Sequence, residues 1–349
     1  MLKLYHVLLA CAGSLAIYGS ASAQLQIVLH PDAALSANPA ALASFQRAAD
    51  SWSIHFSDPI TVNINASLAN LGNPNIIGST SSTLVVGSYT TIRNAMVADG
   101  AAAPNGAILN SLPTAAQFTA FVPAGSSLTG NIVLTQANAN ALGFNVNFGA
   151  DASMTFNSVF NFDYDRSNGI SPGATDFETV AAHEIGHALG FISVVDDADV
   201  GVTSLSMRPL DLFRFQNNVS GRDPSTAAEF TTFPRYFVPG SDAITDDIAN
   251  EFRMSTGVNL GDGSQASHWK ADELTGILIG VMDPTLASDT FETISSADLR
   301  AMDLIGYNLI AVPEPSTIAL SVGAILAAAY GWRRHKSNIQ KQAEQKIVA

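Results

Sequence analysis

The residues best placed to do chemistry are two histidines four positions apart, with a glutamate directly after the first. His183, Glu184 and His187 form a His-Glu-x-x-His pattern. In an α-helix, residues i and i+4 lie on one face, so both imidazoles can bind a single zinc ion. Glu184 can then reach a water bound to that ion and act as its general base. The pattern predicts a zinc site with Glu184 as the catalytic residue.

The residues around this motif predict where its helix begins and ends. Thr175, with Glu178 three residues later, has the spacing of a capping box. Asp176 and Glu178 also suit the positive end of a helix dipole, and Gly190 suits the position that ends a helix. We therefore expect a helix that starts at Thr175 and stops at Gly190.

A catalytic zinc ion needs a third protein ligand. Among the other histidines of the mature chain, His30 follows a predicted strand and His55 ends a predicted helix, so both are expected to be structural. His268 is the remaining histidine and the favoured third ligand. A carboxylate such as Glu251 or Asp211 stays open as an alternative.

The continuation of the motif to Gly190 resembles the opening of the zinc signature of metzincin metallopeptidases. In most metzincins a third ligand follows three residues after this glycine, where this chain has Ser193, which is not a credible zinc ligand. Leishmanolysin-like metzincins carry a long insertion there, and their third histidine lies in a downstream His-Trp pair before a Met-turn. His268-Trp269 and Met282 match that arrangement.

The resemblance covers residues 175–191 and 266–310. It implies zinc ligands at His183, His187 and His268, and a hydrophobic floor beneath them at Met282. Leishmanolysin itself has many disulfides and a propeptide cysteine that keeps it latent. The only cysteine here, Cys11, lies in a predicted signal peptide, so the mature chain has neither feature.

Apolar periodicity predicts the elements that position these residues. The predicted strands are 25–29, 60–64, 144–148 and 154–162, and the predicted helices are 39–56, 87–102, 175–190 and 295–306. The expected fold class is α+β, a metzincin-like zincin. Residues 24–190 would form a mixed twisted sheet with a backing helix and the zinc helix. Residues 191–311 would form a C-terminal subdomain with the Met-turn and a terminal helix.

The two ends of the chain have the patterns of sorting signals. Residues 1–23 combine a cation, an apolar run and Ala-Ser-Ala, as in a secretory signal peptide. Residues 312–336 combine Pro-Glu-Pro, a short apolar transmembrane segment and a basic cluster, and resemble a PEP-CTERM signal processed by an exosortase. Residues 337–349 would be a cytoplasmic tail. A buried helix or a lipoprotein signal at the N-terminus, and a permanent anchor at the C-terminus, are the alternatives.

The net charge of the chain limits the classes of partner that it can bind. The formal net charge is −14, which disfavours nucleic acid and anionic membrane surfaces. The expected contact with a membrane is only through the C-terminal segment. Asp163 and Asp165 alternate along a polar stretch before Gly169, which leaves open a calcium ion, but Ala174 stands where the bidentate glutamate of a calcium loop is expected. The alternative is an ordinary Asx-type turn.

Together these patterns predict an exported zinc metalloendopeptidase of the cell surface or the extracellular space, acting on a protein or peptide substrate. The alternative is a non-catalytic surface or extracellular matrix protein with a structural metal site. Glu184 favours the enzyme, because a structural zinc site has no use for a general base.

Overall fold

The computed structural model describes residues 24–73, 76–102, 106–216, 224–241, 243–246, 251–310, 330 and 332–334. The predicted signal peptide, nearly all of the predicted sorting signal and the predicted tail lie outside these residues. The described residues up to Leu309 form one compact unit. Within the described part of the chain, no helix has both the length and the apolar character needed to cross a bilayer.

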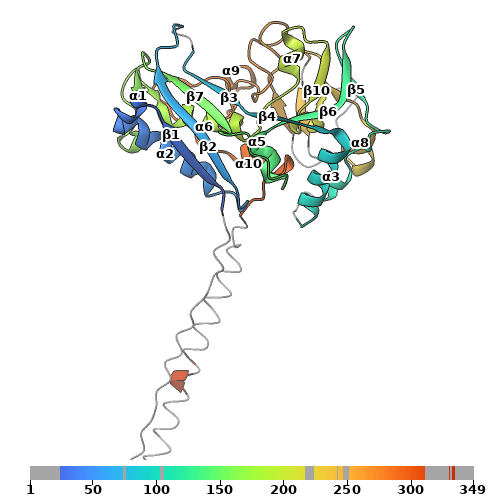
Figure 1. Cartoon of the computed structure of the whole chain (residues 1–349), viewed down its shortest axis with the longest axis horizontal. Helices are drawn as coiled ribbons and strands as arrows, with labels where there is room; N and C mark the ends of the chain where they lie inside the picture. Colours follow the sequence, from blue (N-terminus) through green and yellow to red (C-terminus); the bar gives the residue numbers. More distant parts are fainter. Residues whose placement is uncertain are drawn as a thin grey trace, which may run out of the picture. The chain divides into compact units, whose positions relative to one another are not determined.

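Helices and strands alternate irregularly along this unit (Figure 1). The strands are β1 (Gln26–Pro31), β2 (Thr61–Ala69), β3 (Gly78–Ser82), β4 (Leu84–Ser88), β5 (Ala120–Phe121), β6 (Ser127–Thr135), β7 (Ala152–Asn157), β8 (Phe162–Asp163), β9 (Thr175–Asp176), β10 (Ser204–Met207), β11 (Arg214–Gln216), β12 (Arg235–Tyr236), β13 (Ala243–Asp246) and β14 (Glu251–Met254). The helices are α1 (Ala33–Ser36), α2 (Pro39–Ser53), α3 (Tyr89–Asp99), α4 (Gly106–Asn110), α5 (Gln136–Ala141), α6 (Phe177–Leu189), α7 (Val195–Asp199), α8 (Ala227–Thr232), α9 (Asp272–Thr275) and α10 (Ser296–Leu304), with 3-10 turns at Gly100–Ala102, Arg166–Asn168 and Leu210–Phe213.

The sheet nearest the predicted zinc helix has the order β1-β2-β7-β3. β1, β2 and β7 run parallel, whereas β3 lies antiparallel to β7 at the edge. Val62 and Ile64 alternate with polar residues along β2 and are buried. Such alternation is what a sheet with one buried face requires. The mixed sheet and its helices confirm the α+β class, and the finer zincin assignment remains a proposal.

Two helices pack on each other beside this sheet. α2 contacts α6 and β1, and α6 contacts β3. Phe45 of α2 meets Phe156 of β7 edge-on with ring centroids 5.0 Å apart, and Phe156 lies 4.7 Å from Phe177 of α6. These aromatic contacts fix the helix that carries His183 against β7 of the sheet.

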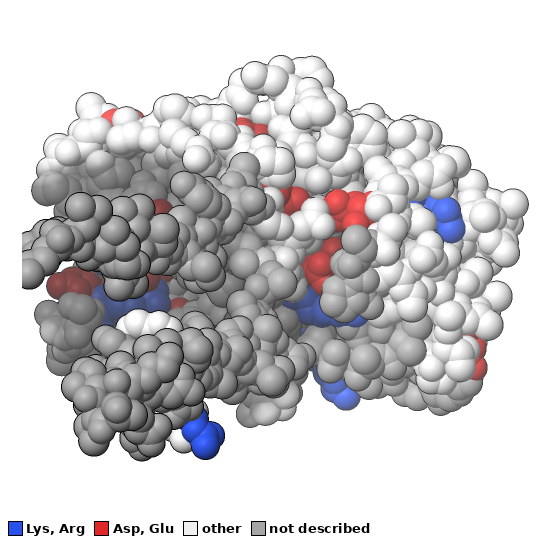
Figure 2. Space-filling view, turned by 90° about the horizontal axis from the view of Figure 1, so that it is seen from below, with Lys and Arg blue, Asp and Glu red and all other residues white. Residues whose placement is uncertain are grey.

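Three further sheets complete the described part of the unit, with the orders β10-β6-β4, β14-β13-β11-β12-β5 and β8-β9. β3 and β4 are separated by Thr83 alone, so the chain passes directly from the first sheet into the second. The face in Figure 2 shows small groups of acidic and basic side chains separated by uncharged surface. That pattern agrees with the low content of charged residues, 13%.

Most of the predicted elements are confirmed. The predicted segments 25–29, 39–56 and 60–64 correspond to β1, α2 and β2, and 87–102 corresponds to α3 with its 3-10 extension. The terminal helix is α10, whose N-cap Ser295 forms a capping box with Asp298.

The predicted strand 144–148 is wrong, because these residues form an irregular turn. Neighbouring side chains occupy the backbone groups that a partner strand would need. Asn140 accepts a hydrogen bond from the N–H of Val146 and donates one to its carbonyl, at 2.7 and 3.0 Å. Asn145 has a φ of 52°, which asparagine tolerates better than most residues. The strand predicted at 154–162 also ends early, at Asn157.

Candidate metal centre

The helix that carries the His-Glu-x-x-His motif is α6, and its cap differs from the prediction. Asp176, not Thr175, is the N-cap, and its carboxylate accepts the N–H of Thr179 at 2.8 Å. The predicted capping box with Glu178 does not form. The Glu178 carboxylate instead pairs with Arg47 of α2 at 2.6 Å. Gly190 ends the helix with a φ of 124°, as predicted.

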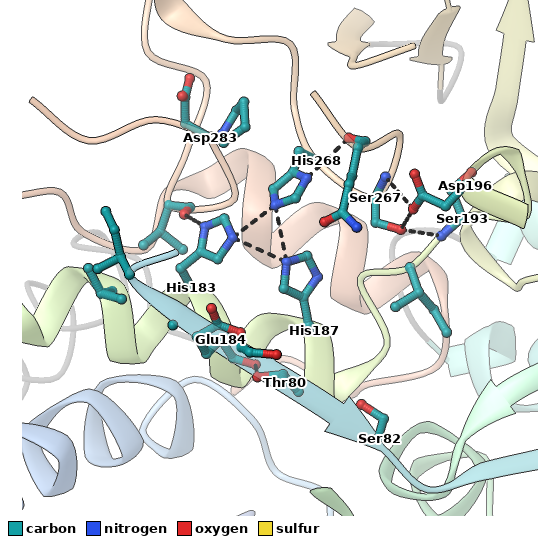
Figure 3. A pocket seen from close by; sticks show the side chains of 18 of the residues that line it. Thr80, Ser82, His183, Glu184, His187, Ser193, Asp196, Ser267, His268 and Asp283 are labelled. Atoms are coloured by element: carbon teal, nitrogen blue, oxygen red, sulfur yellow. Dashed lines mark hydrogen bonds between the residues drawn. The ribbon is translucent and has the colours of Figure 1, made fainter. Parts of the chain in front are cut away.

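The three predicted histidine ligands come together although His268 lies 81 residues after His187. Their Nε2 atoms form a nearly equilateral triangle with sides of 3.0 Å (His183–His268), 3.1 Å (His183–His187) and 3.2 Å (His187–His268). Figure 3 shows the rings converging from α6 and from the loop that carries His268. His268 is only 7% exposed.

The other nitrogen of each ring settles which atom carries the proton. Nδ1 of His183 lies 2.8 Å from the carbonyl of Val281, and Nδ1 of His187 lies 2.8 Å from that of Phe191. Nδ1 of His268 lies 3.1 Å from the carbonyl of Gln265. A carbonyl only accepts, so each Nδ1 must be the N–H donor. In a neutral ring each Nε2 then presents a lone pair to the centre of the triangle.

Three converging lone pairs repel one another unless an electron-pair acceptor lies between them. Burial, followed by the nearby His187, lowers the pKa of His183 to about 3 and that of His268 well below its usual value, so protons do not fill this role at neutral pH. A tetrahedral zinc ion with bonds of about 2.0–2.1 Å separates its ligand nitrogens by roughly 3.3 Å. The observed spacings fit such an ion, and the carbonyls behind the rings fit its outer shell.

Glu184, on the same helix, faces β3 at the edge of the β1-β2-β7-β3 sheet. Its side chain is largely buried, and this burial raises the pKa of its carboxyl. Thr80 of β3 donates to the backbone carbonyl of Glu184 at 3.2 Å. At Gly78 of β3 an added Cβ would lie 2.8 Å from Oε1 of Glu184, so a larger residue there would make the Glu184 carboxyl group shift.

The histidines and Glu184 line a cleft of about 760 Å³ between β3 and the loops that follow α6. Ile77, Ser79 and Ser81 of the β3 segment line it too, together with Val281 and Leu286 from the far side. The cleft is large enough for several residues of an extended chain.

Met282 lies beneath the helix and is fully buried. An added Cβ at Gly186 would collide with the Met282 sulfur, so the glycine between the two ligands of α6 makes room for the methionine. Met282 accepts the N–H of Trp269 through its carbonyl at 2.9 Å. The predicted Met-turn residue therefore lies beside the segment that carries His268.

The sequence analysis missed Asp298, the buried acid of the α10 capping box. Its carboxylate accepts the N–H groups of Val281 and Ser295 and the indole N–H of Trp269, each at 2.8 Å. It thereby joins the residue behind His183 to the residue after His268. The capping-box spacing at 295–298 was a visible signal for the helix start, but not for these distant partners.

The other predicted ligands with described side chains have hydrogen-bond partners of their own. Asp163 accepts three hydrogen bonds from its own loop and Asp165 two, as in an Asx-type turn. Asp211 accepts the hydroxyl of Ser193 at 2.7 Å, and the side chain of Glu251 lies outside the described residues. Among described side chains, a second group that could hold a cation is Asp272, Glu273 and Asp283.

Comparison with known proteins adds no relative. No protein family, no curated protein and no solved structure matches this chain. The chemistry must therefore be argued from the site itself.

Proposed function

We propose that this chain is a zinc-dependent endopeptidase with the ligand arrangement of leishmanolysin-like metzincins. His183, His187 and His268 hold the metal, and Glu184 is the general base. The observation that carries the proposal is the triangle of Nε2 lone pairs, 3.0–3.2 Å apart, with every Nδ1 proton directed to a carbonyl. We also propose that the chain is exported and processed at its C-terminus, as the end patterns predict.

A bound zinc ion would supply a Lewis acid and make a water molecule reactive near neutral pH. Glu184 takes the proton of the attacking water on a carboxylate oxygen and passes it to the departing amine. Its buried environment suits this task, because a raised pKa brings the carboxyl closer to the pH at which it must accept and release a proton. Among the described strands β3 lies at the edge of its sheet, where its main-chain groups could pair with an extended peptide.

The non-catalytic alternative predicts a closed metal site with four protein ligands. Within the described residues the metal-binding group has three members, all histidines, and it opens into the cleft. A site that keeps one position free, next to a buried carboxylate, supports catalysis over a purely structural role.

The test is zinc content and cleavage of casein by the wild type and three variants. We expect one zinc per chain in the wild type, loss of zinc in His268→Ala, and retained zinc with at least ~100-fold less activity in Glu184→Gln. His30→Ala is the matched control, because His30 bonds only Asn63 away from the site. Zinc-loaded wild type without any peptidase activity would overturn the proposal, as would full zinc and activity in His268→Ala.

A further inference from the structure

Between Gly190 and the loop that carries His268, no described side chain belongs to the histidine cluster, yet residues of this segment bind that loop. Asp196 of α7 accepts the N–H of Ala266 at 2.6 Å and that of Ser267 at 3.1 Å. It also accepts the hydroxyl of Ser267. The hydroxyl oxygen of Ser267 in turn accepts the N–H of Ser193 at 2.8 Å. Figure 3 shows Asp196, Ser193 and Ser267 next to His268.

One peptide group connects Asp196 to His268. The N–H of Ala266 and the carbonyl of Gln265 belong to the same planar peptide unit. Asp196 accepts from its N–H side, and Nδ1–H of His268 donates to its carbonyl at 3.1 Å. A carboxylate on the N–H side polarises the unit, which makes its carbonyl a stronger acceptor. The arrangement resembles a carboxylate–histidine–metal triad, except that a peptide group lies between the carboxylate and the ring.

Arg214 holds the same loop from the other side. Its guanidinium is 1% exposed and donates to the carbonyl of Ala266 at 3.2 Å and to that of Ser255 at 2.5 Å. Ser255 donates its own N–H to the carbonyl of His268 at 3.0 Å. The backbone on either side of the ring is therefore fixed, and Asp196 supplies the contact that leads to the ring nitrogen.

We propose that Asp196 is a positioning residue that sets the ring orientation and tautomer of His268 through the Gln265–Ala266 peptide. This inference rests on the proposed function, in which His268 is a zinc ligand. A residue outside the histidine cluster thus holds the distant histidine in place.

The experiment measures zinc affinity by competition with a chromophoric chelator, and the visible absorption spectrum of the protein saturated with cobalt. In Asp196→Asn and Asp196→Ala we expect about 10-fold weaker zinc binding or more, and an altered cobalt spectrum. Asp197→Asn is the matched control. Asp197 is the next residue of α7, and its carboxylate pairs with Arg208 instead of the loop. It should bind zinc within about twofold of the wild type, which is the scatter expected for a surface change.

His268→Ala, measured in parallel, separates the two ideas. If it binds zinc as the wild type does, the proposed ligand set itself is wrong. If it loses zinc while both Asp196 variants keep the wild-type affinity and cobalt spectrum, only the positioning role is overturned. A purely structural Asp196 would lower the unfolding temperature but leave the spectrum of the loaded, folded protein unchanged, and that result also overturns the proposal.

Discussion

His183, Glu184 and His187 come from adjacent turns of α6, whereas His268 and Met282 come from loops between β14 and α10. In the first region the backbone of one helix sets the spacing of the side chains. In the second region no local periodicity does so, and the positions depend on hydrogen bonds to residues far away in the chain. Asp196 and Asp298 each provide such bonds.

The three rings reflect this difference. His187 donates to Phe191, four residues further along the chain, whereas His183 donates to Val281, 98 residues away. Even a ligand on the helix therefore relies on the second region for its tautomer. We infer that the loop region, more than the helix, determines the positions and tautomers of the three histidine rings. Substitutions in the two regions test whether they differ in this way.

The largest effect is expected at Asp298. Asp298→Ala removes a buried acceptor and leaves the N–H groups of Val281, Ser295 and Trp269 without their partner. A buried donor left unpaired costs about 1–3 kcal/mol. With partial relaxation, we expect the free energy of unfolding of the metal-free protein to fall by roughly 3–4 kcal/mol, measured by denaturant titration.

Asp298→Asn is the companion variant, because it keeps the size and one acceptor oxygen and should lose less stability than Asp298→Ala. A loss below about 1 kcal/mol in Asp298→Ala, the size of an ordinary surface change, would show that the loops are held by other contacts. The inference that distant hydrogen bonds hold the second region would then be wrong for Asp298.

An intermediate effect is expected at the cap of α6. Asp176→Ala removes the acceptor for the N–H of Thr179 and the partner of Arg166, which lies 2.6 Å from the carboxylate. Loss of a helix N-cap costs about 0.5–2 kcal/mol. Thr175→Ala is the control, because Thr175 does not cap the helix. Equal losses in the two variants would restore the capping box predicted from the sequence.

The misplaced cap shows where sequence reasoning succeeds and where it stops. The helix and its two histidines were predictable, because spacing along one helix determines which side chains share a face. The cap was off by one residue, since Thr175 and Asp176 both have a side chain that can accept an N–H. Choosing between them requires knowing that the Glu178 carboxylate pairs with Arg47, 131 residues earlier, and so does not complete a capping box with Thr175.

The contacts of Asp196 and Asp298 were not predictable from the sequence, because a single acid has no spacing that reveals a distant partner. Asp196 binds Ala266, 70 residues away, and Asp298 binds Val281, 17 residues away. His268 was singled out because His30 and His55 were expected to be structural and because a family resemblance marked the His-Trp pair. The wrong strand at 144–148 has a similar cause. Its apolar and polar residues alternate, but side chains of Gln136 and Asn140 occupy its backbone groups.

An effect that depends on pH is expected at Glu292, where the two regions meet. Its backbone N–H donates to Thr179 of α6 at 2.8 Å, and its side chain faces the cleft near Asp283 and Asp272. Burial, reinforced by these neighbouring carboxylates, raises the pKa of Glu292 to about 8. An unfolded glutamate titrates near 4.3. Between these two values the folded protein keeps the proton that the unfolded chain has lost, so stability falls as the pH rises.

Glu292→Gln removes this ionisation, because an amide stays neutral throughout. We expect the unfolding free energy of the metal-free wild type to decline more steeply between pH 5 and about pH 8 than that of Glu292→Gln, with the two proteins closest at the acidic end. Denaturant titrations at four pH values measure this difference. Asp50→Asn, which changes an exposed carboxylate of α2 that accepts only from Gln46, should follow the wild type. Parallel curves for wild type and Glu292→Gln would mean that the Glu292 carboxyl is solvated well enough to ionise normally. The contact between α6 and the loops would then be more open to solvent than the hydrogen bonds of Thr179 indicate.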